Sequence, residues 1–495
     1  MRGLFRLVFA LAALGLPAMA AAPGAILAPP APPGAAVKPF VKLDAGRIAL
    51  AHVRLIDGTG SPAQADRTIL IDAGRIAAVT AGSGKAPAGY RVLDLTGRTV
   101  IPGLVGMHDH LFYIARPDLD AAGHSEAPLL APQMSFSAPR LYLAAGVTTL
   151  RTTGSVEPYA DLNLKREIDA GRLPGPHIDA TGPYLEGQGS FIMQLHQLTG
   201  PEDARRTVAF WADQGATSFK AYMYITRAEL KAAVDEAHKR GLKVTGHLCA
   251  VTYPEAIEAG IDNLEHGFFV NTQLDPGKLP DACPDTVGDP TIQKMTPDSP
   301  EAAALIRLLV DHHVAITSTL PVFEQDLPEH APLNPRAMAA LSPQAREAYL
   351  YGRNRRATQG AKARQEAVLA YANDIALEKR FSDAGGVLLA GPDPTGNGGV
   401  VPGFGDQREV ELLVEAGLRP EQAIRIATLN GAIFEGLDAE IGSVAPGKRA
   451  DLVVVDGDPS TAIGDIEKVE TVFKDGVGYD PQALLDSVRG RYGEY

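Results

Sequence analysis

The sequence has few cysteines, no basic stripe, and no long apolar run beyond its first residues. Two cysteines, Cys249 and Cys283, in 495 residues exclude a scaffold built on disulfides and a zinc site made of cysteines. Lys and Arg total 46 against 59 Asp and Glu, a net charge of −13. This acidity argues against a nucleic-acid partner, because no basic surface is available to displace counterions.

The N-terminus is the one place where an apolar run stands out. Arg2 and Arg6 are followed by an apolar run at 7–16 and by small residues at 18–22. This order is typical of a secretory signal peptide, and the run is too short for a permanent membrane span. We expect residues 1–22 to be a signal peptide, and the protein to be periplasmic or secreted with no membrane association after cleavage.

Composition divides the rest of the chain. Residues 23–39 are rich in Ala and Pro, and we expect a linker without packed structure. Short β-like runs separated by glycine-containing turns fill residues 40–101 and return within 439–495. We expect these two segments to form a small β-sandwich, with a larger domain at 102–438 between them.

That larger domain alternates strand-like and helix-like segments. Apolar runs such as 146–151, 216–222 and 242–247 are separated by helical patterns, six of which are followed by glycine as a C-terminal stop. Eight such units predict an α/β fold, a (β/α)₈ TIM barrel whose active site lies at the carboxyl ends of the strands. The helix-rich insertion at 321–383 is either a lid or an oligomer surface, and we expect a homo-oligomer.

Residues able to bind metal lie at the ends of the predicted strands. In a strand, the spacing of His108 and His110 places both rings on one face, where neutral imidazoles can share a metal ion. Further candidates in the fourth, fifth, sixth and eighth strands are Lys220, His247, His266 and Asp393. Any one alone is more often a capping or hydrogen-bonding residue, but their placement on one rim favours a metal site.

These motifs resemble the amidohydrolase superfamily, and among its members the imidazolonepropionase-like and Xaa-Pro dipeptidase-like groups. The resemblance rests on His-x-His at 108–110, Lys220, Val-Thr-Gly-His247, Leu-Glu-His266-Gly and Gly-Pro-Asp393. It extends to the segment 442–453, which is similar to part of the family's small β-sandwich. The resemblance implies a metal-dependent hydrolase whose substrate the motifs do not define.

The resemblance also implies the roles of the ligands. Two divalent ions, with zinc as the expected metal, are expected to be bridged by a carboxylated Lys220 and a hydroxide. His108, His110 and Asp393 are expected to bind the more buried ion, and His247 and His266 the more exposed one. Asp393 is expected to be the catalytic residue that carries the proton to the leaving amine.

The implied reaction is hydrolysis of an amide-type C–N bond. Dipeptides and N-acyl amino acids are the favoured small-molecule substrates. A lactonase, a phosphotriesterase or a cyclic amide hydrolase on the same binuclear site, and a non-catalytic binding protein, remain alternatives.

Substrate contacts are expected from the loops after the strands. The candidates that lie near the predicted strand ends are Arg151, Tyr184, His196, Tyr222 and Tyr224. Packing behind the site is at least as good an interpretation for each of them.

The two cysteines fall in loops after the fifth and sixth predicted strands. Cys249 lies two residues beyond His247, and Cys283 lies in a Pro-rich segment. Adjacent barrel loops can bring them together in a disulfide, and two separate small apolar residues are the alternative.

Overall fold

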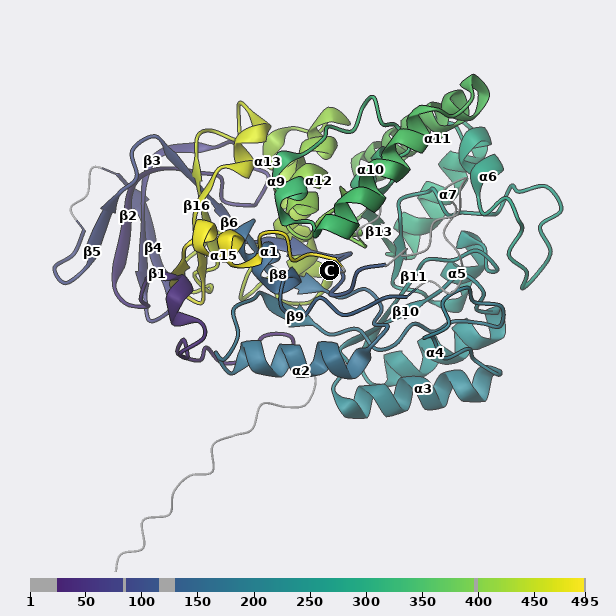
Figure 1. Ribbon diagram of the computed structural model, residues 1–495, viewed down its shortest axis with the longest axis horizontal. Coiled ribbons are helices and arrows are strands. Elements are labelled where there is room, and N and C mark those ends of the chain that lie inside the picture. The colour runs from purple at the N-terminus through teal and green to yellow at the C-terminus, as the bar shows by residue number, and fades with distance from the viewer. Residues whose placement is uncertain (1–24, 83–85, 115–129, 396–398, 494–495) are drawn as a thin grey trace, which may run out of the picture.

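The computed structural model describes residues 25–82, 86–114, 130–395 and 399–493 (Figure 1). The predicted signal peptide at 1–22 lies outside these residues. None of the helices in the described part of the chain has the length and apolar character needed to span a bilayer.

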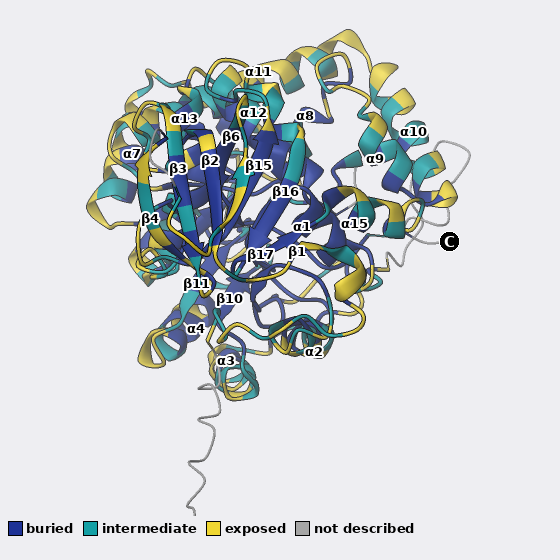
Figure 2. Cartoon of the chain, turned by 90° about the vertical axis from the view of Figure 1, so that its left-hand side faces the viewer, coloured by how far each residue is buried: buried dark blue, intermediate teal, exposed yellow. Residues whose placement is uncertain are grey.

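Segments from both ends of the chain form one nine-stranded sheet, which is seen at the left of Figure 1 and faces the viewer in Figure 2. Its strands follow the order β1-β17-β16-β15-β6-β2-β3-β4, and β5 pairs with β2. Their bounds are β1 Val41–Leu43, β2 Ile48–Leu55, β3 Gln64–Asp72, β4 Arg75–Ala81, β5 Arg91–Asp94, β6 Arg98–Pro102, β15 Leu452–Asp456, β16 Val469–Lys474 and β17 Val477–Tyr479. The two chain ends thus share one sheet by hydrogen bonding, and its division into a sandwich stays a prediction.

Local chemistry explains the β3–β4 hairpin of this sheet. Ala73 and Gly74 both have positive φ angles, 48° and 78°, as a two-residue type I′ turn requires. Ile69 and Ile71 of β3 then fall on the buried face and pack with Val454 of β15 in one apolar cluster. Burial of this face joins the two chain ends.

Parallel strands make up the centre of the molecule. They are β7 Leu104–Gly106, β8 Val147–Arg151, β9 His177–Asp179, β10 Ser218–Ala221, β11 Lys243–Gly246, β12 Asn263–Glu265, β13 Ala315–Ser318 and β14 Leu388–Ala390. Strands β7–β9 form a three-stranded sheet and β10–β14 a five-stranded one. The sequence thus predicted the order of the strands, and the structure divides them between two sheets.

Hydrogen bonds connect the two sheets at both seams. Between β9 and β10, Thr217 N donates to Ala180 O at 3.0 Å and Gly182 N to Ser218 O at 2.9 Å. Beyond β14, Met107 N donates to Ala390 O at 2.8 Å. Individual backbone bonds therefore link the two sheets at both of their neighbouring edges.

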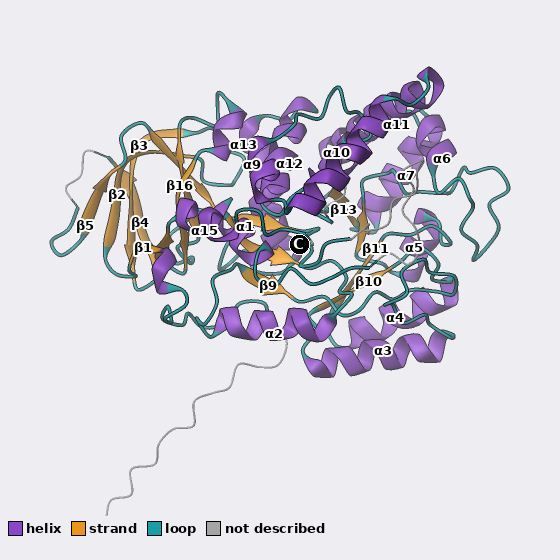
Figure 3. Ribbon diagram, viewed as in Figure 1, coloured by secondary structure: helices purple, strands orange, loops and turns teal. Residues whose placement is uncertain are grey.

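Helices cover these strands on the outside (Figure 3). Those that follow strands are α1 Ala138–Ala144, α2 Pro158–Asp169, α3 Pro201–Gln214, α4 Arg227–Lys239, α5 Tyr253–Ala259, α6 Asp289–Lys294, α7 Pro300–Asp311, α12 Phe404–Glu415, α13 Pro420–Arg425 and α14 Gly431–Phe434. The insertion supplies α8 Leu320–Glu324, α9 Pro335–Ala340, α10 Pro343–Ala357 and α11 Ala361–Asp383, and α15 Pro481–Val488 lies near the C-terminus. Short turns η1 Lys38–Phe40, η3 Ile426–Asn430 and η4 Ile463–Glu467 complete the described elements.

Capping explains where the helices around the site begin. Thr226 and Glu229 form a capping box at the start of α4, and Thr252 and Glu255 form another at α5. Each box satisfies backbone N–H groups that a helix leaves free at its N-terminus. The loops before α4 and α5, which follow β10 and β11, are thereby fixed at one end.

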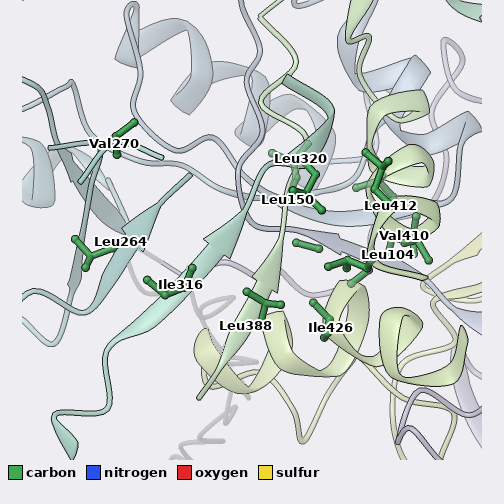
Figure 4. Packing of buried hydrophobic residues seen from close by; sticks show 14 of the residues in the cluster. Leu104, Leu150, Leu264, Val270, Ile316, Leu320, Leu388, Val410, Leu412 and Ile426 are labelled. Atoms are coloured by element: carbon green, nitrogen blue, oxygen red, sulfur yellow. The ribbon is translucent and has the colours of Figure 1, made fainter. Parts of the chain in front are cut away.

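The main core lies between the parallel strands and their helices. Leu104, Leu150, Leu264, Ile316 and Leu388 come from five different strands and are buried in one apolar cluster with residues of the helices (Figure 4). Because neighbours along a strand face opposite sides, the residues between them point into the space that the strands enclose.

The segment predicted as an unpacked linker is partly packed, which corrects that prediction. Lys165 Nζ donates to Ile26 O at 2.8 Å, and Gly34 N donates to Gly171 O at 2.8 Å. Val37 is buried in a cluster that includes Leu143. An Ala- and Pro-rich composition therefore did not prevent packing, because the end of α2 offers hydrogen-bond partners to the segment's backbone.

Candidate metal centre

The structure brings the six predicted ligands together at the carboxyl ends of the parallel strands. Lys220 lies within β10, and His247 and His266 directly follow β11 and β12. His108 and His110 lie beyond the end of β7 at Gly106, not in a strand, which corrects the predicted strand geometry. Their side chains still approach each other, with ring centroids 5.2 Å apart.

Two ligands have an unusual backbone. His266 has φ 67° and Asp393 has φ 55°, both in the left-handed region that non-glycine residues rarely adopt. Such conformations cluster at functional sites because the surrounding structure must hold them in place. Here they direct the two side chains to the same centre.

The distances between the side-chain atoms are short enough for these residues to share metal ions. His110 Nε2 lies 3.0 Å from Asp393 Oδ1, and His108 Nε2 lies 3.6 Å from the same oxygen. Lys220 Nζ is 3.0 Å from His108 Nε2. Single ligand atoms of His108, His266 and Asp393 all lie within 4.8 Å of one another, close enough to take part in one metal centre.

Hydrogen bonds fix three of the rings with Nε2 toward the centre. The Nδ1 partners are Glu265 Oε2 at 2.7 Å for His108, Thr152 O at 3.0 Å for His110 and Thr319 Oγ1 at 3.0 Å for His266. The Nε2 atom of His266 is buried and makes no hydrogen bond with the described residues. Metal-binding histidines are anchored in this way through their second nitrogen, so the residues fit a metal centre.

Burial controls the protonation of the site. It lowers the pKa of His108 and His266 well below the ordinary value and that of His247 to about 3, so the rings are neutral and free to bind a cation. Burial also lowers the pKa of Lys220 to about 8. Burial opposes the ionisation of Asp393, but His108, His110 and Lys220 together hold its pKa below the ordinary value.

Beneath the ligands lies a polar group that sequence reasoning missed. Glu265 accepts hydrogen bonds from His108 Nδ1, from Arg151 Nη2 at 2.9 Å and from Thr245 Oγ1. Asn263, two residues earlier on the same face of β12, accepts from Arg151 Nη2 at 2.6 Å. In the sequence, the only indication of Asn263 and Glu265 was that they alternate with the apolar Leu264 just before His266.

Arg151 was predicted as a substrate contact, and the structure corrects this. Its guanidinium is 1% exposed and donates to Met107 O, Asn263 and Glu265 inside the ring of strands. It therefore fixes the residues beneath the site and has no donor left facing the solvent side.

A cavity of about 170 Å³ opens above the ligands. Tyr184 and Tyr222 line it, as predicted for substrate contacts, and their rings lie 4.8 Å apart. The side chain of His196 is 54% exposed and bonds to Asp203 at 3.0 Å, and it does not line the cavity. Tyr224 is also not among the residues that line the cavity.

The cysteines meet beside this site. Cys249 and Cys283 form a disulfide with their Cα atoms 4.8 Å apart. The bridge joins the loop that begins with His247 to the loop that follows β12. It therefore connects the two loops that leave the strands carrying His247 and His266.

Fold and site together define an α/β protein with a metal centre built on the carboxyl ends of parallel strands. The sequence pattern of the amidohydrolase family matches residues 99–292 and 403–478, more than half of the chain. The chain belongs to this family, whose members are metal-dependent hydrolases acting on carbon–nitrogen bonds.

Individual proteins match this chain either over a short segment or at low sequence identity. Adenine deaminase 2 of Jannaschia sp. (strain CCS1) is 35% identical over 111 residues, which span 22% of this chain and 18% of that protein. A structure described as a candidate prolidase from Bifidobacterium longum has a TM-score of 0.62 and 26% identity, over 90% of this chain and 99% of its own. A Xaa-Pro dipeptidase structure with bound methionine has a TM-score of 0.64 at 22% identity, over 88% of this chain and all of its own, and shows similarity of fold.

Proposed function

We propose that this protein hydrolyses an amide-type C–N bond of a small molecule with two divalent metal ions, zinc being the first choice. The observation that carries the proposal is the convergence of anchored histidines with Asp393 and Lys220 at the end of the parallel strands. His108, His110 and Asp393 would hold one ion, and His247 and His266 the other.

Lys220 would join the two ions as a carbamate. The side chain is 1% exposed, and its lowered pKa makes the neutral amine accessible near neutral pH. A neutral amine can react with carbon dioxide, and the resulting anion provides two oxygens where an ammonium would repel two cations. This assignment rests on the position of Lys220 beside His108.

Asp393 would move the proton of the reaction. Two divalent ions held at this site would supply Lewis acidity toward the scissile carbonyl and toward water. The Asp393 carboxylate is held ionised by its neighbours, so it can accept a proton from water and deliver it to the leaving amine. A positioned acid–base group of this kind contributes roughly 10²–10⁴ in rate.

We propose dipeptides and N-acyl amino acids as the first substrates to examine. The support is the candidate prolidase, which is 26% identical and similar over nearly its whole length. The cavity above the ligands has room for part of such a molecule.

We further propose a closed eight-stranded barrel, a sandwich from the terminal sheet, export and a homo-oligomer. Backbone bonds at both seams support closure. The disulfide and the apolar run at 7–16 support export, because disulfides persist in oxidising compartments.

The test is a screen of metal-reconstituted protein against dipeptides, N-acyl amino acids, esters and phosphotriesters. We expect turnover of one of the amide classes, loss of at least a hundredfold in Asp393→Asn, and no loss in the surface variant Asp383→Asn. Turnover confined to the esters or phosphotriesters would overturn the proposal in favour of a lactonase or phosphotriesterase.

A further inference from the structure

The walls of the cavity above the ligands differ from its floor. The floor consists of His110, Lys220, His247, His266 and Asp393. The other residues that line it form the walls, among them Phe112, Val156, Tyr184, Ile192, Tyr222 and Val322. All of the side chains in the walls are apolar or uncharged.

Several wall residues form an apolar cluster of their own. Phe112, Val156, Tyr184 and Ile192 are buried together, separately from the main core between strands and helices. They come from loops after β7, β8 and β9. Three loops thus contribute to one apolar wall beside the metal site. Burial of their side chains against one another stabilises this arrangement of the loops.

Arg151 and His196, the cationic candidates for substrate contact outside the ligand set, do not line the walls of this cavity. Arg151 is enclosed beneath the ligands by Met107 O and Glu265, and His196 pairs with Asp203 on the exposed side. Among the described wall residues no side chain is cationic. A carboxylate against this wall would lose its hydration without gaining an ion pair, which is costly.

The size of the cavity limits what enters. An apolar protein cavity of about 150 Å³ accommodates benzene, and this one measures about 170 Å³. A phenyl- or isobutyl-sized group therefore fits in it. Leu130 and Phe191, which are 45% and 46% exposed, extend the apolar wall to the outside.

We propose that the substituent of the scissile bond that enters this cavity is uncharged, apolar and about the size of a phenyl ring. The inference rests on the proposed amide hydrolysis and narrows it: of the dipeptides and N-acyl amino acids, those that present an apolar group to the wall are preferred, and those that must place a free carboxylate there are rejected.

The first experiment compares two matched trios with the metal-reconstituted full chain. In one, methylamine is acylated with acetyl, phenylacetyl or succinyl groups. In the other, acetyl is joined to methylamine, benzylamine or glycine. In the trio whose variable group faces the cavity, we expect kcat/KM for the phenyl compound to exceed the other two by at least tenfold, within the range by which apolar pockets discriminate. Preference for the carboxylate member, or no phenyl preference in either trio, overturns the inference.

A charge placed in the wall gives a second readout. Val322 of α8 lines the cavity, and we expect Val322→Arg to lower the ratio of phenyl to carboxylate turnover at least tenfold. Val368→Arg places the same charge on the exposed face of α11 and should leave the ratio unchanged. An unchanged ratio in a folded Val322→Arg protein counts against the inference.

Binding to the wild-type protein separates this inference from the proposed function. Calorimetry should find phenylacetohydroxamic acid at least tenfold tighter than succinic acid monohydroxamate. This binding result without hydrolysis of any amide would overturn the proposed function and support the inference. Hydrolysis with preference for the carboxylate compounds would support the proposed function and overturn the inference. Equal hydroxamate affinities without hydrolysis would overturn both.

Discussion

His108 Nδ1 lies 2.7 Å from Glu265 Oε2, and both side chains are completely buried. The pair joins the loop after β7 to the last residue of β12, and thereby connects the two parallel sheets. Glu265 thereby sets which nitrogen of His108 faces the metal centre and increases the basicity of that nitrogen.

We predict that Glu265→Gln weakens metal binding by about 10–100-fold, as is typical when the residue behind a metal-binding histidine is changed. The amide keeps the shape of the side chain, which limits damage to the packing around Arg151. Competition with a chromogenic chelator measures the affinity, and Glu258→Gln on the exposed surface of α5 is the control. Wild-type affinity in Glu265→Gln would show that the pair does not act on the metal.

Lys220→Ala should lose metal and activity together, because the small side chain cannot form the bridging carbamate. Adding a short carboxylic acid such as propionate should restore part of both, since its carboxylate can occupy the vacated space. Elemental analysis and turnover measure the effect, with the exposed Lys231→Ala on α4 as control. Two tightly bound ions in Lys220→Ala without added acid would exclude the bridge.

The disulfide should contribute measurably to stability. Its cysteines are 34 residues apart, and closing a loop of that length stabilises by about 3–4 kcal/mol in the chain-entropy model. We expect Cys283→Ser to lower the free energy of unfolding in denaturant by this amount. Reductant should bring the wild-type protein to the same level and leave the variant unaffected; a variant as stable as oxidised wild type would rule out the contribution.

The raised pKa of Asp374 predicts that the stability of the protein depends on pH. Burial raises its pKa to about 8, and it accepts a hydrogen bond from Phe268 N at 2.7 Å. Between about pH 4 and 8 the folded state retains a proton that the unfolded state has lost, so this group's contribution to stability is present at low pH and declines as pH rises.

Asp374→Asn keeps the acceptor for Phe268 N but does not titrate. As pH rises through this window, the wild type should therefore lose unfolding free energy relative to the variant. The loss is up to about 1.4 kcal/mol per pH unit for one proton. Denaturant unfolding at several pH values measures the slope. Parallel stability curves for the two proteins would contradict the assignment.

The sequence predicted the strands and the convergence of the six candidate ligands because both depend on short-range patterns. Apolar runs that follow a glycine at the end of a helix mark several of the strands, and the candidate ligands lie in these strands or just after their ends. The place where a strand stops depends on its neighbours, however. Met107 N donates to Ala390 O, outside the short pairing of β7 with β8, so His108 and His110 fall in a loop.

The residues behind the ligands were not predictable in this way. Glu265 acquires its role from His108 and Arg151, which are far away in sequence and meet it only when the strands come together. Arg151 sits at a strand end, where a contact with substrate was a reasonable expectation. Its position on the same face of β8 as Thr149 directs it inward instead, because alternate residues of a strand share a face.

The terminal sheet also determines when the metal centre is completed. Only Gly103 separates β6 from β7, and Gly103 N donates to Asp451 O, while Ile101 of β6 pairs with Val453 of β15. The strand that leads to His108 is thus held by residues near the other end of the polypeptide. The chain must be synthesised at least through β15 before this pairing forms, so all six candidate ligands of a nascent protein are made before β6 finds this partner.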